Sequence, residues 1–198
     1  MRPRHLLHAD VAPAAGVLTR SFWDDPVMGW LNADTTTRDA ELRVSFSVFL
    51  TAGLRRGNTY VLADGPTLTG AAIWVPPQVD ALSAEEAGPL GAARGGRNGD
   101  ERPGRVDALV AAMEAHHPVA AQFYLWIVGV EPAEQGHGLG ERLLAPVLAA
   151  CDAELLPAYL ESTNPRNVGF YRRLGFVVRD EFHPEGGPLL TGMWRDPR

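Results

Sequence analysis

Lysine is absent from this chain of 198 residues, and all 18 of its Lys and Arg side chains are arginines. These arginines form no cluster, and the formal net charge is −6. A nucleic-acid-binding surface needs concentrated positive charge. The composition therefore argues against nucleic acid as the main partner, and we expect none.

Cysteine and long apolar runs are also scarce. Cys151 is the single cysteine, so the chain forms no internal disulfide, which is consistent with a cytoplasmic location. No apolar run is long enough for a membrane span. The basic start, Met1–His5, is followed by no apolar segment of the secretory type. We expect no membrane partner and no secretory signal.

The remaining composition is that of a soluble globular protein, with a hydrophobic share of 45% and a charged share of 21%. The length predicts one domain over residues 1–198. Residues 78–105 are rich in Gly, Arg and Pro and predict a mobile insertion, within which Ser83–Glu86 is a candidate helix start.

Apolar periodicity predicts an alternation of helices and strands. Helices are expected to end near Phe22 and near Gly57, to run from Val106 to His116, to follow Leu139 and to follow Asn164. Strands are expected at residues 5–9, 59–63, 68–75, 123–130, 157–161, from 176 onward, and 189–194.

The stretch Gln135–Gly140 connects the apolar run 123–130 to the helix that opens at Leu139. A strand, a glycine-rich turn and a helix N-terminus together form an anion site. Backbone N–H groups converge there, the helix dipole adds positive potential, and no Cβ blocks a phosphate. The sequence therefore predicts a phosphate-bearing ligand at this turn.

Several ligands compete for this site. The P-loop pattern fails because no Lys-Ser or Lys-Thr follows the glycines. The dinucleotide pattern G-x-G-x-x-G fails because Glu141 and Leu143 stand where its third glycine should be, although Glu161 lies near the distance for a ribose-binding acid. A glycine-rich connection without any ligand also stays open. The pattern that fits is Q-x-x-G-x-G.

That pattern resembles the pyrophosphate-binding loop of the GNAT superfamily of N-acetyltransferases, which bind acyl-coenzyme A. The segment Asn164–Phe176 resembles a second motif of that superfamily, N-x-x-x-x-x-F-Y-x-x-L-G-F. Two motifs in this order are far more specific than one. Further short matches, at residues 128–130, 160–162, 165–167 and 184–186, resemble the puromycin N-acetyltransferase-like members.

The resemblance implies a fold of the α/β class, with a mixed, mostly antiparallel sheet of about seven strands. Helices would cover both faces, and the central fourth and fifth strands would splay apart to admit the pantetheine arm. It also implies acetyl-CoA as co-substrate and a small-molecule amine as partner. The oligomeric state stays open, a homodimer included.

The resemblance also implies the site residues. Tyr171 matches the tyrosine that protonates the departing thiolate; the alternative is a core tyrosine with a satisfied hydroxyl. The fourth strand lacks the carboxylate that many members use as a base, and Glu161 is the nearest substitute. The coenzyme would contact the strand backbone, the loop and the second motif at Val128, Val130, Gln135, Gly136, His137, Gly138, Leu139, Gly140, Asn164 and Asn167.

A cluster of aromatic and acidic residues suggests where the acceptor binds. Trp23, Asp24 and Asp25 follow the first helix, and the chemistry of these residues and Trp74 suits an organic cation. The alternative is a solvated turn whose aromatics pack into the core. His116 and His117 show no third ligand in sequence, so we expect no metal.

Three functions stay open at this point. The first is an acetyl-CoA-dependent N-acetyltransferase that acts on a small amine, antibiotics among the candidates. The second is a module that senses acyl-CoA without turnover. The third is a nicotinamide-dependent oxidoreductase.

Overall fold

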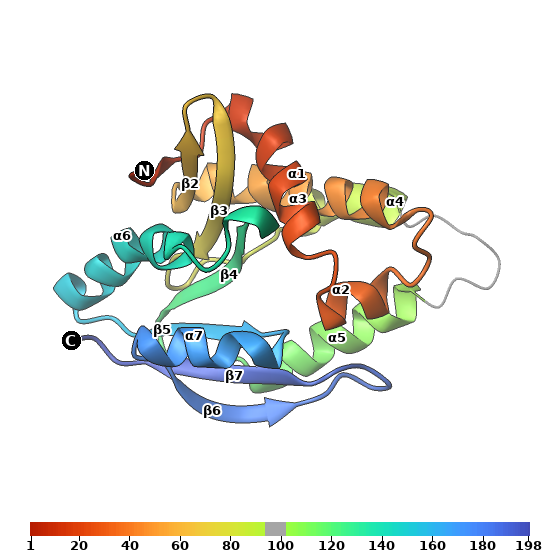
Figure 1. Ribbon diagram of the computed structural model, residues 1–198. Helices are drawn as coiled ribbons and strands as arrows, with labels where there is room; N and C mark the ends of the chain where they lie inside the picture. The colour runs from red at the N-terminus through yellow and green to blue at the C-terminus, as the bar shows by residue number, and fades with distance from the viewer. Residues whose placement is uncertain (94–101) are drawn as a thin grey trace.

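The computed structural model describes residues 1–93 and 102–198 and contains one seven-stranded sheet with the order β1-β2-β3-β4-β5-β7-β6 (Figure 1). All neighbouring strands are antiparallel except β4 and β5, which are parallel. The strands are β1 (Arg4–His5), β2 (Thr59–Asp64), β3 (Thr67–Val75), β4 (Phe123–Val130), β5 (Ala158–Ser162), β6 (Val177–Phe182) and β7 (Leu190–Arg195). The expected mixed, mostly antiparallel sheet is confirmed.

The central strands β4 and β5 splay apart. Their register contains only the pairs Phe123↔Ala158 and Tyr124↔Tyr159. On its other side, β4 stays paired with β3 as far as Val130. The two strands therefore diverge beyond Tyr124, as Figure 1 shows, and the expected splayed pair is confirmed.

Helices cover both faces of the sheet, which confirms the expected layering (Figure 1). Within the described ranges the α-helices are α1 (Val11–Ser21), α2 (Pro26–Leu31), α3 (Arg38–Arg56), α4 (Ala84–Ala93), α5 (Arg102–His116), α6 (Leu139–Glu154) and α7 (Val168–Arg173). Short 3-10 helices span His8–Asp10, Pro132–Glu134 and Pro165–Asn167. No helix in these ranges is long and apolar enough to cross a membrane.

Two apolar cores lie on opposite faces of the sheet, because the central strands are buried on both sides. One core joins the sheet to α6 and α7, and the other joins it to α1 and α3. Gly129 allows α1 to approach β4, since a Cβ there would lie 2.7 Å from Leu18 Cδ2 and 2.9 Å from Ser21 Oγ.

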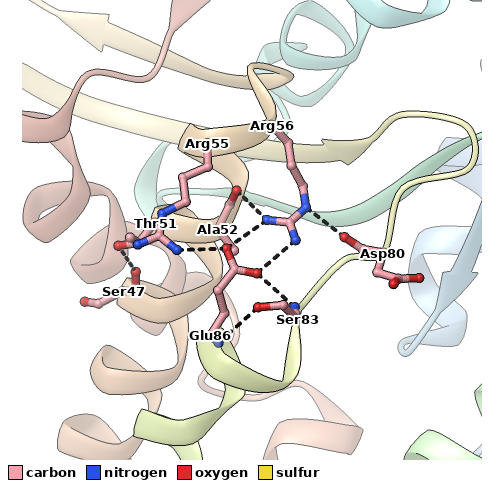
Figure 2. A network of polar contacts seen from close by, with 8 residues as sticks. All are labelled: Ser47, Thr51, Ala52, Arg55, Arg56, Asp80, Ser83 and Glu86. Atoms are coloured by element: carbon pink, nitrogen blue, oxygen red, sulfur yellow. Dashed lines mark hydrogen bonds and ion pairs between the residues drawn. The ribbon is translucent and has the colours of Figure 1, made fainter.

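The expected insertion at 78–105 is partly helical. Ser83 and Glu86 form a capping box at the start of α4, with Glu86 N–H donating to Ser83 Oγ at 3.2 Å and Ser83 N–H donating to Glu86 Oε2 at 2.9 Å. Arg56 Nη2 lies 2.9 Å from the same oxygen and joins α4 to the end of α3 (Figure 2). The Arg56 guanidinium lowers the pKa of Glu86 to about 2. Residues 102–105 belong to α5, which starts at Arg102 and not at the predicted Val106, and residues 94–101 lie outside the described residues.

One prediction about the first residues is wrong, and one early helix was not predicted. The strand expected at 5–9 is wrong, because only Arg4 and His5 pair with β2. Asp10 turns the chain there: its carboxylate accepts the Leu7 N–H at 2.8 Å and pairs with Arg4. The sequence also gave no sign of α2, a six-residue helix that follows Asp25.

Candidate active site

A cavity of about 380 Å³ lies where β4 and β5 diverge. It is bounded by both strands, by α2, α4 and α5, and by the start of α7. Its lining residues are Phe22, Val27, Met28, Leu31, Phe46, Phe49, Leu82, Ala87, Leu90, Val106, Leu109, Val110, Met113, Tyr124, Leu125, Trp126, Ile127, Val128, Leu160, Glu161, Ser162, Thr163, Asn167 and Tyr171. Both predicted catalytic residues, Tyr171 and Glu161, are among them.

Tyr171 is a buried residue of α7 that lines this cavity. Its side chain therefore borders the space in which a ligand would bind. Burial raises the pKa of Tyr171, and the nearby charge of Asp25 raises it further. The phenol therefore stays protonated at neutral pH and can act as a proton donor.

Glu161, on β5, supplies a carboxylate whose side chain is only 1% exposed. Its Oε1 lies 3.4 Å from Nδ1 of His117. Its Oε2 is buried and has no hydrogen-bond partner among the described residues. His117 Nε2 in turn lies 3.0 Å from the side-chain nitrogen of the buried Gln122. This arrangement was not predicted, because 44 positions separate His117 from Glu161.

Two tyrosines missed by the sequence analysis lie beside Glu161. Tyr124 lines the cavity, and burial together with the charge of Glu161 raises its pKa well above the ordinary range. Tyr159, its partner in the β4–β5 register, is fully buried and has its pKa raised by the same two causes. Both are therefore neutral hydroxyls at neutral pH. Only the strand pairing brings them to Glu161.

The turn before α6 leaves open space for a ligand. Gly136 has φ 82° and Gly138 has φ 75°, and a Cβ built on either would meet no atom within 4 Å. These left-handed conformations favour glycine. The first N–H groups of α6 lack intrahelical partners, as at every helix start. Gln135 Nε2 donates to the carbonyl of Val130 at 3.1 Å and fixes the turn against the end of β4. The geometry fits a phosphate group.

The other residues predicted to bind the coenzyme lie in the cavity, at the turn before α6 or at the start of the second motif. Val128 and Asn167 line the cavity. His137 lies in the exposed turn, Leu139 is buried under the first turn of α6, and Gly140 packs against the Phe170 ring of α7. Asn164 is an N-cap, as expected, because its Oδ1 accepts the Arg166 N–H at 3.1 Å. Its amide thus fixes the start of the second motif.

The predicted substrate wall is not brought to this cavity as one unit. Trp74 is fully buried in the core that faces α6, because its position on β3 points into that layer. The guanidinium carbon of Arg38 lies over the ring of Trp23, 5.3 Å from the ring centroid. Asp24 is exposed, whereas Asp25 is buried at the start of α2. None of the four is among the cavity-lining residues given above.

Cys151 and the histidines can also be placed. Burial raises the pKa of Cys151 to about 11, as expected for a core thiol. His116 Nδ1 lies 2.7 Å from Asp180 and its ring stacks on Phe182, so the adjacent histidines serve different partners. Among the described residues, no group of three or more His, Cys, Asp or Glu could hold a metal ion.

Comparison with known proteins identifies the domain. Residues 84–178, which include the turn, Glu161 and Tyr171, match the family profile described as "Acetyltransferase (GNAT) domain". An uncharacterized N-acetyltransferase of Schizosaccharomyces pombe is 28% identical over 185 residues, covering 88% of this chain and 73% of that protein. Residues 84–178 are thus similar to a GNAT acetyltransferase domain. The protein is an acyltransferase of the N-acetyltransferase type.

Solved structures share the fold of this acetyltransferase. A crystal structure from Corynebacterium glutamicum, described as histone acetyltransferase HPA2 and related acetyltransferase, superposes with a TM-score of 0.73 at 24% identity and covers 100% of this chain and 96% of that chain. The PaiA N-acetyltransferase of Thermoplasma acidophilum, solved in complex with coenzyme A, superposes with a TM-score of 0.59 at 12% identity, covering 98% of each chain. At these identities the likeness concerns the fold.

The two neighbouring acids of the acetyltransferase predict a contrast in stability. Asp25 Oδ1 accepts the N–H groups of Val27 and Met28, each at 3.0 Å, and its Oδ2 accepts the Thr163 hydroxyl at 2.6 Å. Asp25→Ala removes this cap and the link to the end of β5. We expect the free energy of unfolding to fall by about 1–2 kcal/mol, measured by urea denaturation.

Asp24→Ala is the matched control, because exposed Asp24 should change stability by less than about 0.5 kcal/mol. Equal stability of the two variants would contradict the capping role. If the two acids form a substrate wall, both variants should instead raise the acceptor KM without loss of stability.

A pH dependence follows from the burial of Asp25. Burial raises its pKa, although the hydrogen bonds that it accepts from Thr163, Met28 and Val27 oppose this shift. A carboxyl whose pKa is higher in the folded state favours folding most below its unfolded pKa, near 3.9, and this contribution is lost as pH rises through the folded value. Relative to Asp25→Asn, which does not titrate, the parent should lose stability as pH rises across that window. If the difference in unfolding free energy between the parent and Asp25→Asn did not change with pH, the raised pKa of the buried Asp25 carboxyl would be contradicted.

Proposed function

We propose that this acetyltransferase moves the acetyl group of acetyl-CoA to the primary amine of a small molecule by direct attack. The observation that carries the proposal is the cavity between the splayed β4 and β5, which both Tyr171 and Glu161 line. In this proposal, residues 1–198 form one acetyltransferase domain. The protein acts in the cytoplasm. The puromycin-like motifs support an antibiotic among the candidate acceptors.

The coenzyme would bind along the open edge of β4. The turn Gln135–Gly140 offers backbone N–H groups and two glycines with open space above them, which suits the pyrophosphate. Beyond Tyr124 the edge of β4 has no strand partner on the β5 side, so the pantetheine arm can pair with it near Val128 and Val130. The PaiA N-acetyltransferase of Thermoplasma acidophilum, which shares the fold and was solved in complex with coenzyme A, supports coenzyme A as the ligand.

The cavity has the groups that acetyl transfer needs. A neutral amine attacks the thioester carbonyl directly, so no covalent enzyme intermediate is required. The ammonium must first lose a proton, and in this proposal the carboxylate of Glu161, which lines the cavity, accepts it. As the nitrogen–carbon bond forms and the carbon–sulfur bond breaks, Tyr171 donates its proton to the thiolate. Two protons leave the nitrogen in all: the first passes through Glu161 to solvent, and the second, lost as the amide forms, replaces the proton that Tyr171 gave to the thiolate.

A thiol-release assay over a panel of amines tests the proposal. We expect acetyl-CoA to bind in isothermal titration, NADH not to bind, and free coenzyme A to appear only when an acceptor amine is present. Binding of acetyl-CoA without release over the whole panel would favour the acyl-CoA sensor. Binding of NADH instead would favour the oxidoreductase.

A further inference from the structure

The cavity is far less polar than a site for a sugar or a polyamine. Its wall away from Tyr171 is built by apolar side chains of α2, α5 and β4, including Met28, Leu31, Leu109, Met113 and Trp126. A hydroxyl or a second charge placed against such a wall loses its hydration without gaining a hydrogen bond. The wall therefore favours an apolar guest.

Glu161 is the one charged side chain among the described lining residues. Its side chain is 1% exposed, and the buried Oε2 has no hydrogen-bond partner in the described part of the chain. A buried carboxylate oxygen without a donor is costly, and such atoms are normally satisfied in a folded protein. An ammonium group would supply both an N–H donor and a positive counter-charge to this oxygen.

Gln122 and His117 fix the other oxygen of Glu161. The Gln122 Nε2 atom lies 3.4 Å from the carbonyl of Pro118 and 3.0 Å from His117 Nε2. A carbonyl can only accept, so the NH2 group of Gln122 points this way, and His117 Nε2 must accept from it. The ring proton then sits on Nδ1, which faces Glu161 Oε1 at 3.4 Å. His117 thus holds one oxygen, whereas Oε2 meets no donor at hydrogen-bonding distance and angle among the described residues, although the hydroxyls of Tyr124 and Tyr159 lie close enough to the carboxylate to have their pKa values raised by it.

From this arrangement we infer that the acceptor is a lipophilic primary amine with a single positive charge, whose ammonium docks on Oε2 of Glu161. The inference rests on the proposed function and names its substrate class. The apolar part of the acceptor lies against α2 and α5. Along the described part of that wall, a second ammonium would meet no counter-charge, and the hydroxyls of an amino sugar would meet no side-chain partner.

A homologous series of amines tests the class. With acetyl-CoA fixed, kcat/KM should rise roughly fourfold per methylene from propylamine to hexylamine. Hexylamine and 2-phenylethylamine should exceed 1,6-diaminohexane, glucosamine and a peptide with a free N-terminus by about 100-fold. In the dead-end complex with coenzyme A, Glu161→Gln should weaken hexylamine binding about 10-fold or more by titration calorimetry.

Val110 offers a variant that should not disturb folding, because it lines the cavity and is 47% exposed. Val110→Asp adds a second negative charge, so it should lower kcat/KM for hexylamine and raise it for 1,6-diaminohexane. Val119, which is fully exposed and does not line the cavity, gives the matched control. Val119→Asp should leave both values unchanged.

The outcomes separate this inference from the proposed function. A preference for diamines, amino sugars or peptides would overturn the inference and leave the acetyl transfer standing. If rates rose with acyl-chain length of the CoA ester and not with amine length, the apolar space would hold the acyl group, and the inference would again be overturned. If no amine released the thiol, the proposed function would fail, and the inference with it.

Discussion

Gly138→Asp is expected to raise the Kd for acetyl-CoA roughly 100-fold or more, because like charges brought together at a binding site cost several kcal/mol. Gly138 is the N-cap of α6, and nothing lies within 4 Å of a Cβ built on it. The new carboxylate would thus occupy the open space that a phosphate needs. Titration calorimetry of the folded variant measures the effect.

Two controls separate charge from backbone strain. Gly138 has φ 75°, a left-handed conformation that Asn and Asp adopt more readily than other residues. Gly138→Asn matches the shape of Asp without its charge, so it should lose much less affinity. Gly65 has φ 57° and equally open surroundings in the β2–β3 turn, and Gly65→Asp should not alter binding. Unchanged affinity in Gly138→Asp would move the coenzyme away from this turn.

Elements with a strong local pattern were predictable from the sequence. The apolar run Phe123–Val130 is β4 with the predicted bounds, and helix α5 ends at His116 as expected. Asn164 followed by Pro165 gave a helix start that the structure confirms through the Arg166 N–H. In each case neighbouring residues supply the physical cause, so the local sequence was sufficient.

Long-range contacts account for what the sequence could not supply. Asp25 and Thr163, which share a hydrogen bond, are 138 positions apart, and no local pattern pairs them. Helix α2 has six residues, too few for a periodic pattern. Helix α5 has an apolar side, which predicts that this side faces the interior of the protein. The same pattern is expected whether Leu109 packs on the sheet or, as observed, lines a cavity. Which of the two applies depends on the splay of β4 and β5.

The role of Tyr171 as proton donor was predicted from the family resemblance, and its surroundings make the expected pH dependence more specific. Tyr171 is a buried residue that lines the cavity. Its raised pKa also means that it does not titrate below the ordinary tyrosine value of about 10. The pH profile of the parent enzyme should therefore show no alkaline loss of activity from this residue below that pH.

Tyr171→Phe is expected to lower kcat about 10²–10⁴-fold, the usual contribution of a positioned proton donor. The ring keeps its packing against Phe176, and only the hydroxyl is lost, so the Kd for acetyl-CoA should stay close to that of the parent. Tyr60→Phe is the control, since the ring of that tyrosine lies 4.5 Å from the ring of His5 near the far edge of the sheet and the variant should keep normal turnover. A structural tyrosine would give the opposite pattern, with lower stability in urea and normal kcat in the folded fraction. Turnover of Tyr171→Phe at the parent rate would mean that water protonates the thiolate.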